Sequence, residues 1–253
     1  MADLDRRYAQ GTTVGRTDAG VVDQGLRAYM IRVYNYMAAG VALTGVVAWL
    51  TFNAAVVTDA AGRITGLTPF GQTIFSGPMT IVLFLGTLGL VFFMSFRISN
   101  LQPSTALMLF LAYAGLLGLM LSSVFLAYTG ASITRTFFIS AASFGALSLY
   151  GYSTQRDLSP IGSFLIMGLF GLILAMLVNM FLKSSGLEFA ISAIGVLIFA
   201  GLTAYDTQRI KEMYSANDDG TIAGRKAVMG ALQLYLDFIN LFLFLLRFMG
   251  DRR

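Results

Sequence analysis

The sequence contains no cysteine and no histidine. Disulfides, thiolate nucleophiles and zinc sites of the usual kind depend on one or both of these residues, so they are excluded. Haem ligation through histidine and histidine-dependent catalytic triads are excluded for the same reason. Any response of this protein to pH near neutrality therefore has to come from its carboxylates.

Charged residues are also scarce. They make up 12% of the 253 residues, whereas a soluble domain carries about 25%, and 57% of the chain is hydrophobic. The 21 phenylalanines and 27 glycines fit this composition, because glycine lets the backbones of membrane helices approach closely. We therefore expect an all-α, polytopic membrane protein rather than a globular domain with one anchor.

The motifs of several enzyme classes are missing. The chain has no GxxxxGK[ST] loop, no HExxH pair and no dinucleotide fingerprint after a strand. We expect neither an enzyme nor a bound cofactor. The net charge of +4 suits cytoplasmic loops that face anionic lipid headgroups, so a lipid bilayer is the expected surrounding and nucleic acid is not an expected partner.

Seven apolar stretches are each close to the 20 residues that a helix needs to cross a bilayer. The fourth is rich in serine and alanine and is the least apolar. Residues 1–27 are polar and are predicted to form a cytoplasmic N-terminal arm, followed by a seven-helix transmembrane domain over residues 28–253. The stretches cover residues 31–52, 79–97, 104–127, 132–152, 160–182, 187–206 and 228–249.

Proline and glycine positions support these boundaries. Pro78, Pro103 and Pro160 stand at the starts of three stretches, where a missing backbone N–H does no harm. Residues 53–77 form the longest predicted linker. Glycines recur at three-residue spacing within the same three apolar stretches, which predicts close helix contacts along those faces. These pairs are Gly86 and Gly89, Gly115 and Gly118, and Gly168 and Gly171.

The basic residues predict an orientation. With the N-terminus inside, the cytoplasmic side holds eleven of the seventeen lysines and arginines, as the positive-inside rule requires. Seven spans then place the C-terminus outside. The basic pair Arg252 and Arg253 argues the other way, and a re-entrant last segment would leave six full spans with the C-terminus inside.

The most informative residue is Asp237, because it lies near the middle of the apolar residues 228–250. A charge at a helix centre costs about 2.5–3.5 kcal/mol on insertion scales. Gln233, Asp237 and Asn240 are spaced i, i+4 and i+7, so they share one helix face, which is predicted to point into the bundle or a wet cavity. The alternative is a buried polar cluster that only fixes helix packing.

A second carboxylate, Asp206, ends the preceding apolar stretch. It follows a face of small and polar residues that could lie against Asp237, although a solvated position at the cytoplasmic interface is the alternative. If the two carboxylates meet away from water, they cannot both ionise cheaply and titrate as a coupled pair. With a proton they can share a hydrogen bond, and without it they repel and can attract a hard cation such as Ca²⁺.

A basic group near this pair would offset its charge. Arg97, at the inner end of residues 79–97, is the candidate, and an ordinary positive-inside anchor is the alternative. No firm metal site is predicted. A transient calcium contact at Asp206 and Asp237 is expected, with Gln233 and Asn240 lining or bracing the path.

Three blocks of the sequence resemble signature blocks of the Bax inhibitor-1 (transmembrane BAX inhibitor motif) family. The first is Gly-Leu-Thr-Ala-Tyr-Asp-Thr-Gln at residues 201–208. The second is Leu-Tyr-Leu-Asp-Phe-Ile-Asn-Leu-Phe at residues 234–242, followed by Leu-Arg-Phe at 246–248. The third is Ser-Leu-Tyr-Gly-Tyr-Ser-Thr at residues 148–154 with Arg-Asp-Leu after it, and it is similar to a block of bacterial inner-membrane members.

This resemblance implies a seven-helix fold with the last helix central, in a bacterial inner membrane. It implies a pH-sensitive calcium leak channel whose proton-sensing aspartates correspond to Asp206 and Asp237. In some members an arginine near the inner end of the second helix latches onto the first aspartate, and Arg97 is the nearest match. Some members have an acidic residue within that helix, and residues 79–96 have none.

Three functions follow as hypotheses. The first is a proton-gated leak for calcium or another cation. The second is a non-transporting regulator that binds another membrane protein, since other bacterial members are partners of a membrane protease. The third is an intramembrane aspartyl protease, which is disfavoured because Asp237 lies in Leu-Tyr-Leu-Asp rather than in a GxGD motif.

Overall fold

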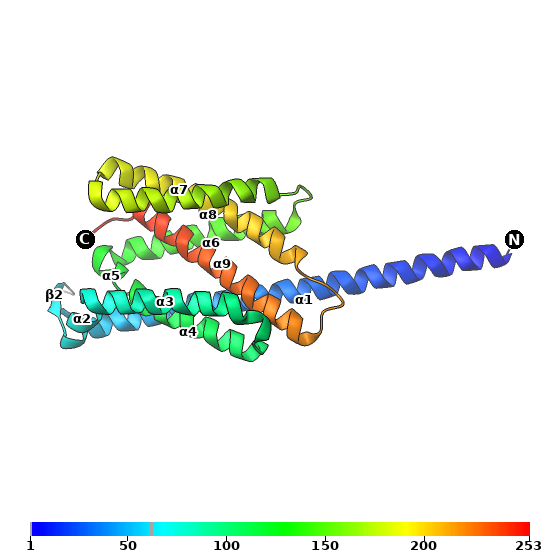
Figure 1. Ribbon diagram of the computed structural model, residues 1–253, viewed down its shortest axis with the longest axis horizontal. Helices are drawn as coiled ribbons and strands as arrows, with labels where there is room; N and C mark the ends of the chain where they lie inside the picture. The colour runs from blue at the N-terminus through cyan, green and yellow to red at the C-terminus, as the bar shows by residue number, and fades with distance from the viewer. Residues whose placement is uncertain (1, 61–62) are drawn as a thin grey trace.

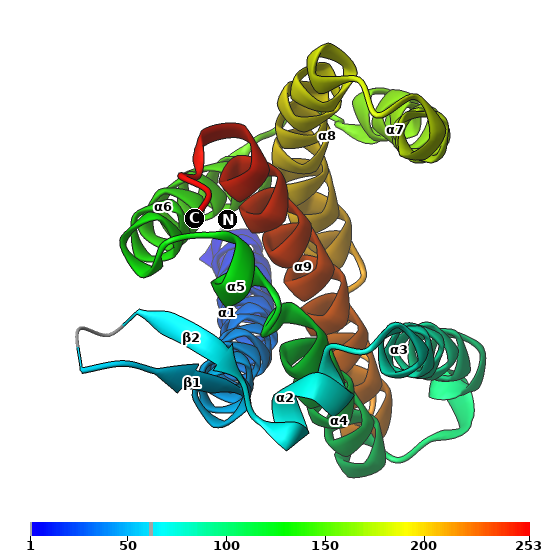
Figure 2. The ribbon, with the colours of Figure 1, turned by 90° about the vertical axis from the view of Figure 1, so that its left-hand side faces the viewer.

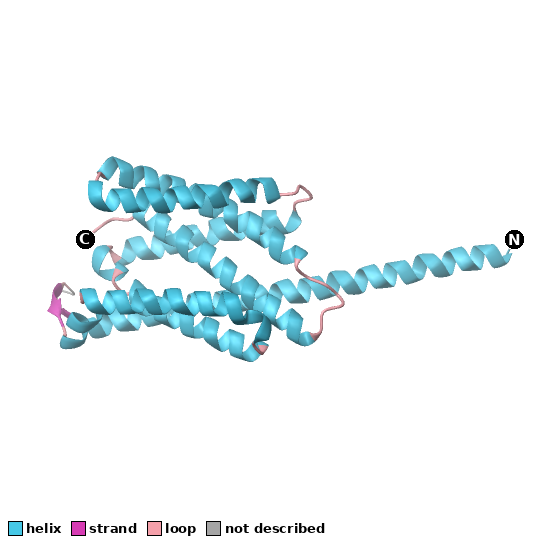
Figure 3. Cartoon of the chain, in the orientation of Figure 1, coloured by secondary structure: helices cyan, strands magenta, loops and turns pink. Residues whose placement is uncertain are grey.

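A computed structural model describes residues 2–60 and 63–253, with side chains described from residue 24 onward except for Ser99. Long helices account for most of this part of the chain (Figure 3). A helix satisfies all of its backbone hydrogen bonds internally, which is what an apolar sequence requires in lipid. The long helices are α1 (Ala2–Ala55), α3 (Gly77–Arg97), α4 (Pro103–Leu121), α6 (Gly130–Ser153), α7 (Ser159–Leu182), α8 (Ser185–Glu212) and α9 (Gly220–Met249).

Six segments in the described part of the chain are long and apolar enough to cross a membrane. They correspond to six of the seven predicted stretches, and the protein is a membrane protein. The exception is α6, the stretch rich in serine and alanine, which forms a helix of 24 residues but falls outside this group. Both α8 and α9 extend beyond their predicted limits, so Asp206 lies within a helix rather than at its end.

The helices form an elongated bundle, and the two termini lie at opposite ends of it (Figure 1). Helix α1 has 54 residues, about 80 Å at 1.5 Å per residue, so it is far longer than one span. Its N-terminal part projects beyond the other helices (Figure 1). Helix α9 is continuous over 30 residues and is therefore long enough to cross a bilayer without a break.

A small hairpin lies where the sequence predicted only a linker. Strand β1 (Val56–Thr58) pairs antiparallel with β2 (Ile64–Leu67), and the short helix α2 (Pro69–Ile74) follows. The all-α prediction missed these strands because three or four residues are too few to show an alternating pattern. Two further short elements, the 3₁₀ helix η1 (Ile98–Asn100) and α5 (Val124–Ala127), flank α4.

Helix starts follow from local side chains. Proline occupies the first or second position of α3, α4 and α7, as predicted. Besides α2, which Thr68 caps, four helices begin with a side-chain oxygen that accepts a hydrogen bond from the backbone N–H three residues later. Each such bond satisfies one of the free donors of the first turn. These caps are Ser76, Thr129, Ser184 and Asp219.

Helix α9 contacts α1, α4, α6 and α8. Figure 2 shows it crossing obliquely between α8 and α4. It is the most buried of the candidate spans. Within its apolar 18-residue segment 61% of the residues are buried, whereas the corresponding share for α7 is 11%. The Tyr235 hydroxyl lies 2.6 Å from the Thr44 hydroxyl, which donates to the Ala114 carbonyl, so one polar chain joins α9, α1 and α4.

The C-terminal residues lie along the start of α6. The backbone of Thr129 donates to the Asp251 carbonyl, and Arg253 donates to the carbonyl of Ala127. An ion pair of 3.1 Å joins Arg135 to Asp251. These contacts fix the end of α9 to the neighbouring helix.

Candidate functional site

The site is built where α8 and α9 pack against each other. Two glycines allow this approach. A Cβ on Gly195 would lie 2.4 Å from the ring of Phe244, and one on Gly230 would lie 2.9 Å from Ile210. Real Cβ atoms essentially never come within 3.0 Å of another group, so a side chain at either position would force Phe244 or Ile210 to move.

Asp206 and Asp237 come together at this contact. Only 6% of Asp206 and 5% of Asp237 is exposed. Their carboxyl groups are close enough to form a side-chain hydrogen bond with each other, and Gln233 makes a similar contact with Asp206. Two ionised carboxylates have no hydrogen to donate, so this geometry is suited to a pair that holds one proton.

One oxygen of the pair remains without a partner. Asp237 Oδ2 is buried and forms no hydrogen bond with the described residues. A buried carboxylate oxygen left in this way is costly when charged, and a proton or a visiting cation would satisfy it.

The pair faces a cavity of about 690 Å³ between α3, α7, α8 and α9. Most of its wall is apolar, from leucines, isoleucines and phenylalanines. Two aspartates and two arginines supply its charged groups, so the cavity is neutral when both carboxylates are ionised. The charged and amide residues of the wall are Asp206, Arg209, Gln233, Asp237, Asn240 and Arg247.

Two further cavities adjoin the first. One of about 430 Å³, next to the loop between α8 and α9, has Arg209 and Gln233 in its wall as well. Another of about 340 Å³, at the other end of α8, shares Met176 and Arg247 with the central cavity. The three cavities therefore follow one another along the bundle, with an arginine at each junction.

The predicted face of α9 lies on this wall. Gln233, Asp237 and Asn240 all border the central cavity, as their i, i+4 and i+7 spacing indicates. The Asn240 side chain also donates to the Leu236 carbonyl of its own helix.

Arg97 is not at the site. It ends α3, its side chain is exposed, and the hydrogen bonds and ion pairs found among the described residues include none between it and either aspartate. The basic group whose charge acts on Asp206 is Arg209, one helical turn further along α8. Sequence reasoning overlooked Arg209, although its i+3 spacing from Asp206 was a usable signal.

A chain of hydroxyls lies directly beside Asp206. Thr207 Oγ1 is 2.9 Å from Ser148 Oγ, which is 2.6 Å from the Tyr34 hydroxyl. Thr207 donates its one hydrogen to the Thr203 carbonyl, so Ser148 must donate to Thr207 and Tyr34 to Ser148. This chain ties α1 and α6 to α8 and was not predicted.

The two other residues of the Tyr-Asp-Thr-Gln run hold the start of α7. Gln208 Oε1 accepts from the Leu158 backbone N–H, and its Nε2 donates to the Arg156 carbonyl. The ring of Tyr205 packs on Gly162, where a Cβ would lie 2.5 Å away. The run thus contacts the start of α7 through Tyr205 and Gln208 and α6 through Thr207, which fixes the position of the carboxyl of Asp206.

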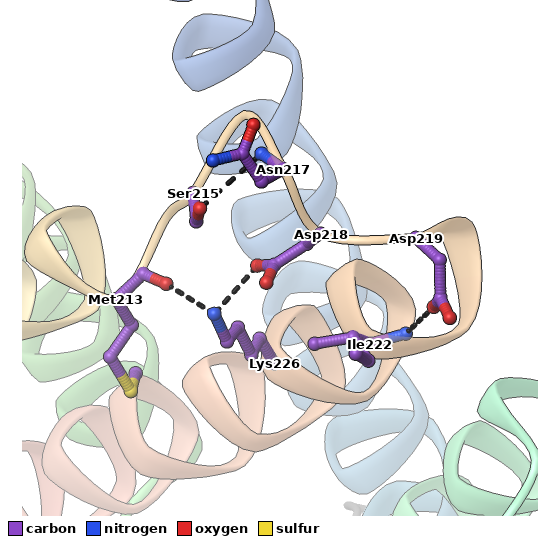
Figure 4. Close-up of polar contacts among 7 residues, drawn as sticks. All are labelled: Met213, Ser215, Asn217, Asp218, Asp219, Ile222 and Lys226. Carbon is purple, nitrogen blue, oxygen red and sulfur yellow. Dashed lines mark hydrogen bonds and ion pairs between the residues drawn. The ribbon is translucent and has the colours of Figure 1, made fainter.

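The loop between α8 and α9 joins the two aspartate-bearing helices (Figure 4). Lys226 of α9 donates to the Met213 carbonyl at 2.8 Å and pairs with Asp218 at 2.6 Å. Asp219 caps the start of α9 by accepting from the Ile222 N–H. The lysine therefore holds the end of α8 beside the first turns of α9.

The acidic side chains of the described residues do not form a metal-binding site. Within residues 2–60 and 63–253, no three Asp, Glu, His or Cys side chains gather in a way that could hold a metal ion. Calcium takes six to eight oxygen ligands, so the two carboxylates with Gln233 and Asn240 offer an incomplete shell.

Comparison with known proteins covers almost the whole chain. The family model described as "Inhibitor of apoptosis-promoting Bax1" matches residues 26–253. An uncharacterized protein of Rickettsia prowazekii is 52% identical over 231 residues, 91% of this chain and 92% of its own. The Escherichia coli inner membrane protein YbhL is 47% identical, over 90% of this chain and 94% of its own. An uncharacterized protein of Caulobacter vibrioides is 43% identical, with both chains fully covered.

Proposed function

The chain belongs to the Bax inhibitor-1 family, and we propose that it is a pH-sensitive leak channel for cations, calcium in particular. The observation that carries this proposal is the pair of buried carboxyl groups on the wall of a cavity that adjoins a further cavity at each end. An ionisable pair inside a membrane bundle is expected to serve an ion or proton pathway.

The proposed architecture has seven spans, with α6 as the seventh and α9 at the centre. Termini at opposite ends of the bundle support an odd number of spans (Figure 1). Contacts of α9 with four other helices support its central place. We further propose a cytoplasmic N-terminus and a bacterial inner membrane, because the basic residues favour that side and YbhL is an inner membrane protein.

The aspartate pair provides the pH dependence in this proposal. With one proton the carboxyl groups share a hydrogen bond and hold α8 against α9. When that proton leaves, two unit charges about 4 Å apart repel by about 4 kcal/mol at an effective dielectric constant of 20. That energy is enough to shift the packing of two helices, and the separated carboxylates then attract a hard cation.

Gln233 and Asn240 support the ion in passage. Their amide oxygens lie one turn to either side of Asp237 on the same wall and offer neutral oxygen ligands. No catalytic step is assigned to the aspartates, and no resident cofactor is required.

The test is calcium flux into dye-loaded liposomes across a range of pH. We expect Asp206→Asn and Asp237→Asn to remove the pH dependence, because asparagine hydrogen bonds at every pH and does not ionise. Asp157→Asn is the matched control, since Asp157 lies in an exposed loop outside the membrane segments. A pH-dependent flux that survives both dyad substitutions would overturn the proposal.

A second candidate is a non-transporting regulator of another membrane protein, such as a membrane protease. The observation that favours it is the presence of Arg209 and Arg247 in the same cavity as the aspartates, because they lower the attraction of the path for cations. A stoichiometric partner captured by cross-linking, combined with absence of flux in liposomes, would support this function over the channel.

A further inference from the structure

A groove separate from the aspartate cavity runs between α1 and α6. It has a volume of about 700 Å³, within the range of ligand sites. The two helices are held together at its floor by the hydrogen bond from Tyr34 to Ser148. The residues that face it on α1 are Arg27, Met30, Ile31 and Tyr34, spaced along one helix side.

The groove has apolar walls and a floor of hydroxyl groups that are already hydrogen bonded. Tyr34 and Ser148 already satisfy each other and Thr207, so the floor does not need a polar ligand. Its rims are large exposed side chains, with 49% of Ile31 and 66% of Leu149 accessible. Such a surface is suited to a hydrocarbon chain.

The end of the groove nearest the N-terminus is basic. Arg27 lines it, and Tyr152 lines it from α6. Lys211 Nζ lies 5.4 Å from the centre of the Tyr152 ring. No aspartate or glutamate is found among the described residues that border the groove. One basic group at the membrane surface stabilises the binding of an anionic headgroup by about 1 kcal/mol.

The dimensions suit one leaflet. The distance from Arg27 to Tyr34 along the helix axis is about 10 Å, and one leaflet of the hydrocarbon core is about 15 Å thick. A headgroup at Arg27 would therefore place an acyl chain along most of the groove and end it near the hydroxyl floor.

We propose that this groove binds one anionic glycerophospholipid, with its phosphate at Arg27 and one acyl chain between α1 and α6. The bound lipid occupies the gap between the two helices and thus supports the Tyr34–Ser148 contact. This site is separate from the aspartate pair and does not depend on whether the protein conducts ions.

The test uses native mass spectrometry of the full chain with phosphatidylglycerol or phosphatidylcholine as the added lipid. We expect the wild type to bind phosphatidylglycerol about fivefold more tightly than phosphatidylcholine, which corresponds to about 1 kcal/mol. Arg27→Gln should remove most of that preference. Arg32→Gln is the matched control, because Arg32 is an exposed arginine of the same helix that does not line the groove.

A second variant tests the acyl chain. A Cβ on Gly145 has open space within 4 Å, so Gly145→Leu should fold and fill the groove. It is expected to lower binding of both lipids. Equal binding of the two lipids by the wild type, or an equal loss in Arg27→Gln and Arg32→Gln, would overturn the proposal. Loss of a dimer in Gly145→Leu with lipid binding unchanged would instead assign the groove to a second copy of the chain.

Discussion

Thr207 and Ser148 join α8 to α6 through hydroxyl groups 2.9 Å apart, immediately beside Asp206 along α8. We expect Thr207→Val to destabilise the protein by about 1–3 kcal/mol, because the buried hydroxyl of Ser148 would lose the oxygen that accepts its hydrogen bond. Thermal unfolding in detergent measures this effect. Thr80→Val is the control, since Thr80 is exposed and, like Thr207, donates to the carbonyl four residues earlier. Equal losses in the two variants would show that the contact with Ser148 contributes nothing.

Gly151 is a second position where α6 meets α8. A Cβ there would lie 2.1 Å from the Ala204 carbonyl oxygen, which is backbone and cannot rotate away. We expect Gly151→Ala to cost about 1–3 kcal/mol through overpacking, although alanine is the better helix former. Gly145→Ala on the same helix has open space and should be neutral or stabilising. If both variants unfold at the wild-type temperature, the close packing of α6 on α8 is wrong.

Lys183 is the only non-glycine residue with positive φ among the described residues, at 50°. It ends α7 in the left-handed conformation, which costs an L-residue about 1–2 kcal/mol relative to glycine. Lys183→Gly should therefore raise the unfolding temperature. Lys183→Ala removes the same charge but keeps a Cβ, so it should give no gain. A gain of equal size in both variants would assign the effect to charge.

Arg247 lies where the central cavity adjoins the one at the α7–α8 end of the bundle. If cations pass this point, Arg247→Gln should increase calcium flux about fivefold, which corresponds to removing about 1 kcal/mol of repulsion. The liposome flux assay measures it. Arg135→Gln serves as control because Arg135 is exposed and pairs with Asp251. A flux unchanged by Arg247→Gln would exclude this route for the ion.

Lys226 tests the loop between the aspartate helices (Figure 4). Its pair with Asp218 is partly exposed, so the ion pair alone is worth less than about 1 kcal/mol. Lys226→Met should accelerate hydrogen exchange of residues 213–222 while leaving global stability nearly unchanged. The control is Lys183→Met, at an exposed lysine, which should leave exchange in that loop unchanged. Exchange at the wild-type rate in Lys226→Met would contradict the role of Lys226 in holding the end of α8 beside α9.

Much of the helical layout follows from the sequence. The lengths of the apolar runs predict six of the membrane helices, and the prolines mark three of their starts. The spacing of Gln233, Asp237 and Asn240 predicts a shared face because it depends only on the helix repeat. These features are local, so they are visible without knowledge of the tertiary contacts.

Contacts between helices were harder to predict. Gly118 packs on Thr44 as expected, whereas a Cβ placed on Gly86 or Gly89 would meet no neighbour within 4 Å. Spacing shows that two glycines share a face, but it does not show which helix meets that face. Helix contacts closer than the one at Gly118 occur instead at Gly151 and Gly195, which lie outside the predicted glycine pairs.

Polar contacts across the bundle could not be read from the sequence either. The hydroxyl chain from Tyr34 to Thr207 joins residues more than a hundred positions apart, and nothing in either neighbourhood indicates the other. The latch assigned to Arg97 was inferred from family resemblance, whereas the arginine that faces Asp206 is on its own helix.

The order of the helices along the chain has a consequence for biosynthesis. Helix α9 contacts α1, α4, α6 and α8, all of which leave the ribosome before it does. Until α9 is inserted, Asp206 has no carboxyl partner from that helix, and the buried face that α9 covers is open to lipid. The core around Asp206 is therefore completed only when α9 is in place, and a chain that stalls before that point exposes Asp206 without its carboxyl partner.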